Sequence, residues 1–136
     1  RNQDVILDEP LKVWEYLYPD IRSDTVEKVW VICLDRKNKV IRTEAVTSGT
    51  ANASLIHPRE VFRPAIRYGA TAVILAHNHP SGDPTPSTAD LKVTKKIFEA
   101  AKVVDLEIHD HVILGEPENS PNGFGYFSFS DNGLFN

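Results

Sequence analysis

The sequence predicts a mixed α/β fold, in which helices pack on the faces of a sheet whose strands form hairpins. Two observations lead to this prediction. Apolar segments at 29–34 and 40–46 are separated by a short polar turn, a pattern typical of an antiparallel hairpin. A continuous apolar run at 71–76 is followed by an amphipathic helical pattern at 87–102. With 136 residues, 41% of them hydrophobic, the chain can form one substantial core.

The first predicted helix begins at Pro10 and continues to about Tyr18. Proline suits the first turn of a helix, where the amide groups have no intrahelical partner. Pro19 is expected to stop this helix, because proline cannot continue the hydrogen-bond pattern. Trp14, Leu17 and Tyr18 would form its buried side.

The hairpin at 29–46 comes next, and we expect both of its strands to lie beside the functional site. Pro58 then begins a second helix, which continues to about Tyr68 and is closed by Gly69. The apolar run at 71–76 is the predicted central strand, and it leads directly into the residues discussed below.

Beyond the helix at 87–102, apolar and polar residues alternate through 104–109, which predicts a half-buried strand that continues to 115. An exposed loop is expected at 116–123, because proline, glycine and asparagine are frequent there. The aromatic residues that follow predict a last apolar strand and are assigned to the core: Phe124, Tyr126, Phe127 and Phe129.

The segment with the most candidate metal ligands begins at the carboxyl end of the central strand, with His77 and His79. This edge of a sheet is where α/β proteins usually bind ligands. Side chains two residues apart in an extended chain point to the same side, so both imidazoles can approach one ion. Asp90, in the first turn of the next helix, adds a carboxylate. Three such ligands leave the fourth position of a zinc ion to a water, whose pKa would fall to ~7.

Simpler interpretations of these residues remain open. A His-x-His pair is weak evidence alone, because histidine is often an ordinary loop or surface residue. Ser87-x-x-Asp90 resembles a capping box, in which the two side chains would only complete the start of a helix. Asn78, Ser81 and Asp83 could line the site, but loop shaping is their preferred role, and Gly82, Pro84 and Pro86 could be only the turn residues of a long connection.

Asp110 and His111 lie within the strand predicted after the long helix. They could form a second metal site, or a pair that orients one of the ligand histidines. An ordinary hydrogen-bonded strand position is the commoner role for such residues.

The chain contains the signature H-x-H-x7-S-x-x-D, formed by His77-x-His79, seven further residues and Ser87-x-x-Asp90. It therefore resembles the JAMM (MPN+) metalloproteases. Segments 76–82 and 86–90 are most similar to the bacterial RadC branch of that family. The likeness covers nearly the whole chain from about Glu27. Similar residues occur at Val29–Asp35, Ser48-Gly49-Thr50, His57-Pro58-Arg59-Glu60, Asp110-His111-Val112-Ile113 and Ser128-Phe129.

The resemblance implies a fold and a set of ligands. The fold is an α-β-α sandwich around a mixed, partly antiparallel sheet, of the kind that JAMM domains share with cytidine deaminases. His77, His79 and Asp90 match the zinc ligands of the family.

The resemblance also implies roles for two catalytic residues. Ser87 matches the serine that helps to stabilise the oxyanion formed when a carbonyl is attacked. The family further needs a glutamate that holds and deprotonates water at the start of an early strand. Glu27, just before the strand at 29–34, is the best match, and Glu44 is the competitor. A glutamate in such a place is more often a solvated surface residue.

These matches imply a zinc-dependent hydrolase, a metallopeptidase or isopeptidase that acts on a peptide or isopeptide bond with Zn²⁺ as its cofactor. A non-catalytic, metal-stabilised interaction module is one alternative, and a metal-dependent nuclease of DNA repair is another. A net charge of −4 opposes phosphate binding by this domain alone. The lysines of the long helix are expected to be a solvated face: Lys92, Lys95, Lys96 and Lys102.

Composition completes these expectations. We expect one domain over residues 1–136, soluble and cytoplasmic, since no segment is long and apolar enough to span a membrane. Cys33 is expected to be a buried apolar residue rather than a reactive thiol. The chain has no methionine, so we expect it to be a fragment that lacks an amino-terminal helix-hairpin-helix segment of RadC-like proteins. The oligomeric state stays open.

Overall fold

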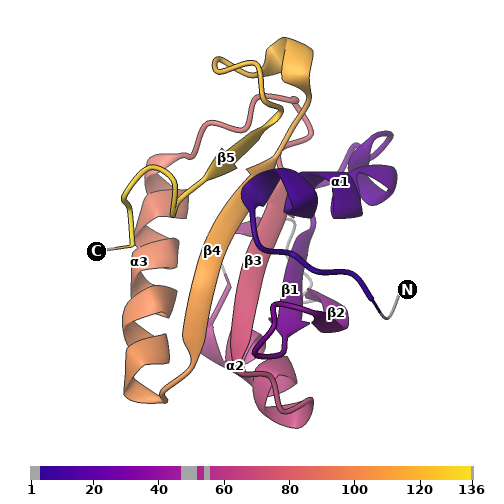
Figure 1. Ribbon diagram of the computed structural model, residues 1–136. Helices are drawn as coiled ribbons and strands as arrows, with labels where there is room; N and C mark the ends of the chain where they lie inside the picture. Colours follow the sequence, from indigo (N-terminus) through magenta and orange to yellow (C-terminus); the bar gives the residue numbers. More distant parts are fainter. Residues whose placement is uncertain (1–3, 47–51, 54–55, 136) are drawn as a thin grey trace.

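A computed structural model describes residues 4–46, 52–53 and 56–135, and it has the predicted mixed α/β fold (Figure 1). Five strands form one sheet in the order β2-β1-β3-β4-β5. They are β1 (Val29–Leu34), β2 (Val40–Val46), β3 (Ala72–Asn78), β4 (Glu107–Leu114) and β5 (Tyr126–Ser128). β3 and β4 are parallel, whereas the other neighbouring pairs are antiparallel. The sheet is therefore mixed and partly antiparallel, as expected.

Helices cover both faces of this sheet. Helix α1 (Pro10–Ile21) packs on one face, against β4 and β5, and shares a core with Trp30 and Ile32 of β1. Helices α2 (Pro58–Arg67) and α3 (Thr88–Val103) pack on the other face, where Val31 and Cys33 of β1 point. Side chains alternate between the two cores because successive residues of a strand point to opposite faces. The expected α-β-α sandwich is confirmed.

β1 and β3 occupy the centre of the sheet, and every residue of both strands is buried. A strand that is covered on both faces is expected to be a continuous apolar run. β3 keeps that run through Ala76 and then ends with His77 and Asn78. The polar end of the most buried strand is therefore where the predicted ligands begin.

Helix α1 does not stop at Pro19, as the sequence suggested, but continues to Ile21. Pro19 lies so close to the helix end that it removes only one hydrogen bond of the last turn. Burial of Ile21 in the core compensates for that loss, and the Arg22 amide still donates to the Tyr18 carbonyl at 3.1 Å. Trp14 is only half-buried on this helix, as is Tyr18, while Leu17 is fully buried.

Two predicted strand limits were also wrong. β4 begins at Glu107, because α3 extends to Val103 and Asp105 then turns the chain at a φ of 59°. Val104 lies in that turn and is half-exposed. Phe124 is exposed rather than part of the core, because glycines with positive φ stand on both sides of it and keep it in a turn before β5. Phe129, by contrast, is fully buried.

Cys33 is buried in the core, and burial raises the pKa of its thiol to about 11, as expected of an inert apolar residue. Within the described part of the chain, every helix is too short or too polar to cross a lipid bilayer. The segment Ser48-Gly49-Thr50, which contributed to the family resemblance, lies outside the described residues.

Candidate metal centre

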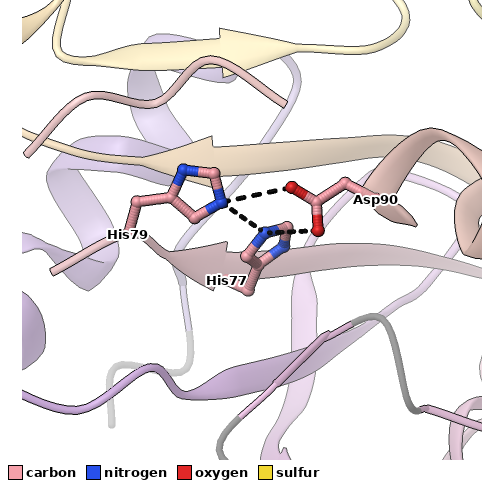
Figure 2. A group of neighbouring side chains, drawn as sticks. All are labelled: His77, His79 and Asp90. Atoms are coloured by element: carbon pink, nitrogen blue, oxygen red, sulfur yellow. Dashed lines mark hydrogen bonds and ion pairs between the residues drawn. The ribbon is translucent and has the colours of Figure 1, made fainter. Parts of the chain in front are cut away.

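Two of the predicted ligands come from the end of β3. His77 is fully buried, with Val29 of β1 on one side and Ile113 of β4 on the other. His79 lies just past the strand, where its backbone amide donates to the Leu114 carbonyl at 2.9 Å. The chain is therefore still tied to β4 at His79, and the two imidazoles turn toward the same point (Figure 2).

The third predicted ligand, Asp90, completes the start of helix α3. Its backbone amide donates to Ser87 Oγ at 3.0 Å, and the Ser87 amide donates to Asp90 Oδ2 at 2.9 Å. The capping-box interpretation is thus correct. It does not compete with a ligand role, because the same buried carboxylate faces His77 and His79 (Figure 2).

The spacing of the three side chains fits one small divalent ion. His79 Nε2 is 3.2 Å from both His77 Nε2 and Asp90 Oδ2, and His77 Nε2 is 3.6 Å from Asp90 Oδ1. Ligand atoms about 2.05 Å from a tetrahedral zinc ion lie about 3.3 Å from one another. Among the described residues, this is the group of histidine, cysteine and acidic side chains that could hold a metal ion.

The electrostatics of the cluster also favour a cation. Burial opposes ionisation of Asp90, but its hydrogen bonds with His77 and His79 outweigh burial and leave its pKa far below the usual value. Burial likewise opposes protonation of His79, yet the Asp90 carboxylate and the Asp83 carbonyl raise its pKa above the usual 6.5. The lone pair of a neutral His79 faces the Asp90 carboxylate, because the other ring nitrogen of His79 faces a carbonyl, so a proton or a metal ion between the two groups is favourable.

The loop after β3 orients His79. Its Nδ1 lies 2.9 Å from the Asp83 carbonyl and can only donate there, which leaves Nε2 free to bind an ion. The Asp83 carboxylate in turn accepts from the Thr85 amide at 3.0 Å and from its hydroxyl at 2.7 Å. These bonds agree with the loop-shaping role expected of Asp83.

Asn78 does more than shape this loop. Its side-chain oxygen accepts from the Lys28 amide at 2.6 Å, and its side-chain nitrogen donates to the Val26 carbonyl at 3.1 Å. The residue between these two contacts is Glu27. The amide of Asn78 therefore fixes the backbone on both sides of the predicted general base.

The two candidate glutamates occupy different surroundings. Glu27 is half-buried, accepts a hydrogen bond from the Ala53 amide, and lies close enough to His79 to help raise the pKa of that imidazole. Glu44 lies on β2, at the edge of the sheet, and forms an ion pair of 3.4 Å with Arg42. The geometry therefore associates Glu27, rather than Glu44, with the histidine cluster.

Asp110 and His111 prove to have separate roles. Asp110 accepts from the His111 and Ser130 amides and from the Ser128 hydroxyl, at 2.6–2.9 Å. Burial outweighs these bonds and raises its pKa. Successive strand residues point to opposite faces, so the His111 ring lies on the other side, with Nε2 at 2.7 Å from His77 Nδ1.

Neither residue joins a second metal site among the described residues. His111 does contact a predicted ligand, which the sequence left open. Burial, together with the nearby His77, lowers the pKa of His111 well below its usual value, so this imidazole is neutral.

A model of the RadC-like JAB domain family matches residues 7–134. The chain belongs to this family. A UPF0758 protein of Symbiobacterium thermophilum is 48% identical over 130 residues, which is 96% of this chain and 53% of that protein. UPF0758 proteins of Methanosarcina barkeri and Chlorobium phaeovibrioides are 42% and 44% identical, over 92% and 97% of the chain.

The RadC-like chain spans about half the length of these curated relatives, between 52% and 56% of each. Their names identify a family and state no activity. What the family and the geometry establish together is a JAB domain with a buried His-His-Asp cluster that is compatible with a bound metal ion.

Proposed function

We propose that this RadC-like domain is a zinc-dependent hydrolase of amide bonds, a metallopeptidase or isopeptidase. The observation that carries the proposal is the combination of a three-residue ligand cluster with the half-buried carboxylate of Glu27, whose charge acts on His79. A closed structural zinc site uses four protein ligands, whereas a catalytic site uses three. The ligands would be Nε2 of His77, Nε2 of His79 and a carboxylate oxygen of Asp90.

A zinc ion held there would polarise a substrate carbonyl and acidify a water molecule. The protein must then supply a group that accepts the water proton and returns it to the leaving amine. Glu27 is suited to this role, because the two bonds from Asn78 hold its backbone while Ala53 holds one end of its carboxylate. General bases of this kind contribute about 10²–10⁴-fold to a rate.

Ser87 is suited to stabilise the oxyanion that forms on an attacked carbonyl. Its oxygen accepts the Asp90 amide, so its hydroxyl hydrogen remains available for donation. It also stands at the N-cap of α3, where the helix dipole favours negative charge. The serine therefore combines a positioned donor with a favourable field.

The test is cleavage of a broad panel of peptides and isopeptide-linked conjugates by zinc-loaded protein. We expect Glu27→Gln to lose about 10²–10⁴-fold in turnover while its zinc content stays unchanged. Glu44→Gln is the matched control, because it removes a carboxylate from the same region of the sheet, and it should keep full activity. Equal turnover by the parent and Glu27→Gln would exclude the proposed base.

A second candidate is a metal-stabilised interaction module without turnover. It is favoured by the double role of Asp90, since an ion held by that residue would tie helix α3 to the end of β3. It predicts that zinc removal lowers the melting temperature while no substrate is found. The nuclease alternative has less support, because the net charge of −4 opposes binding of a phosphate backbone.

A further inference from the structure

Behind the metal centre, three buried side chains from three different elements form one line of hydrogen bonds. Thr94 Oγ1 of α3 lies 2.7 Å from His111 Nδ1 of β4, and His111 Nε2 lies 2.7 Å from His77 Nδ1 of β3. The exposed fractions of the three residues are 2%, 4% and 0%. Water is thereby excluded, so each ring nitrogen in the line depends on its neighbour for a partner.

The line can run in only two directions, because a neutral imidazole donates from one nitrogen and accepts at the other. In one direction His77 Nδ1 donates to His111, and His111 Nδ1 donates to Thr94. This leaves a lone pair on His77 Nε2, the atom that faces His79 and Asp90. In the other direction the Thr94 hydroxyl donates, and the ring hydrogen of His77 sits on Nε2.

Only the first direction allows His77 to bind a metal ion, since a ligand nitrogen must carry no hydrogen. Thr94 is suited to accept at the end of that line. A threonine hydroxyl within a helix can donate to a carbonyl of the preceding turn while its oxygen accepts another bond. The His111 ring is itself fixed by stacking on Phe129, with centroids 4.8 Å apart and planes at 11°.

We infer that His111, supported by Thr94, is a positioning residue that holds His77 in the tautomer whose Nε2 binds the metal ion. His111 is not itself a ligand, because its Nε2 is engaged by His77. The inference rests on the proposed metal site, but it does not depend on which bond the domain hydrolyses.

The test compares Thr94→Val with Thr94→Ser in the purified domain. Valine has nearly the shape of threonine but cannot accept the His111 hydrogen, whereas serine keeps the hydroxyl. We expect Thr94→Val to weaken zinc binding by about 10–100-fold in a chelator competition, and Thr94→Ser to bind zinc nearly as the parent does. Thermal melting in the absence of zinc checks that both variants are folded.

Nitrogen NMR of the imidazoles gives a readout that a merely structural role would not change. In zinc-free protein, the parent and Thr94→Ser should show His77 with its hydrogen on Nδ1, and Thr94→Val should show a mixture of tautomers. His111→Phe retains an aromatic ring against Phe129 and should lose at least as much zinc affinity as Thr94→Val.

Equal zinc affinity of the parent and Thr94→Val would overturn the positioning role and leave the metal site intact. Equal losses in Thr94→Val and Thr94→Ser would overturn it as well. Failure of the parent to bind zinc would overturn both this inference and the proposed function. Absence of peptide cleavage by a zinc-binding parent would affect the proposed function alone.

Discussion

Zinc affinity of this domain should depend steeply on pH, because a proton and the ion compete for His79. The pKa of His79 is raised: burial opposes its protonation, but the Asp90 carboxylate and the Asp83 carbonyl outweigh burial. The pKa of Asp90 is lowered, so this ligand is already ionised. Of this pair, therefore, only His79 has to release a proton when the ion binds.

The expected magnitude follows from one displaced proton. Below the raised pKa of His79, each pH unit should change the apparent zinc affinity about tenfold, or about 1.4 kcal/mol. Above that pKa the affinity should level off. Chelator-competition titrations across the pH range give the slope and the position of the bend.

Asp90→Asn supplies the decisive comparison for this reasoning. Without the carboxylate, the pKa of His79 should fall, so the bend should move to lower pH while the affinity decreases at every pH. Affinity that does not vary with pH in the parent would refute proton competition. An unchanged bend in Asp90→Asn would refute the assignment of that proton to the His79–Asp90 pair.

Three further predictions concern stability. Without zinc, the raised pKa of His79 stabilises the fold below about pH 6.5, and the lowered pKa of Asp90 stabilises it above about pH 4. The melting temperature measured in chelator should therefore be highest between these two pH values. The increase in melting temperature that zinc causes should instead grow toward alkaline pH. Asn78→Ala should cost about 1–3 kcal/mol of unfolding free energy in urea titrations, because the Lys28 amide loses a partner, and a wild-type value would contradict this. Phe129→Ala should cost about 3–5 kcal/mol in the same assay, and a loss below about 1 kcal/mol would show that its packing is not needed.

The sequence was sufficient to predict features that depend on neighbouring residues. The two-residue spacing of His77 and His79 at a strand end predicted that their rings share one side, and they do. The capping pattern of Ser87 and Asp90 predicted the start of α3 to within one residue. In both cases the relevant geometry is set by fewer than five consecutive residues.

Features that depend on strand pairing were not predictable in the same way. His111 meets His77 because parallel pairing sets β4 beside β3, and a bulge shifts the register between Val73 and Ile74. A slip of one residue would have turned Asp110 toward the site instead. No local pattern of the sequence determines that register, so the roles of Asp110 and His111 stayed open until the fold was known.

The choice between Glu27 and Glu44 has the same origin. Glu27 precedes the first strand of the hairpin and Glu44 lies within the second, so from sequence alone either could be the general base. Antiparallel pairing of β1 with β3 brings the start of β1 beside His77, because Val29 is its partner across the strands. Glu27 is therefore near the cluster because β1 runs antiparallel to β3, and the sequence around a glutamate does not determine how its strand pairs.

The three proposed ligands converge because each has its own independent support. The Ser87 amide holds Asp90, the Asp83 carbonyl holds His79, and a hydrogen bond with the His111 ring holds His77. None of these contacts requires a bound ion, so the scaffold itself keeps one ligand atom from each of the three side chains within 4.8 Å of the others. The lone pair of a neutral His79 facing the Asp90 carboxylate is unfavourable, and the proton that relieves it is lost as the pH rises through the raised pKa of His79. A divalent ion relieves the same repulsion at higher pH, and for that reason zinc should stabilise this fold even if no substrate is ever turned over.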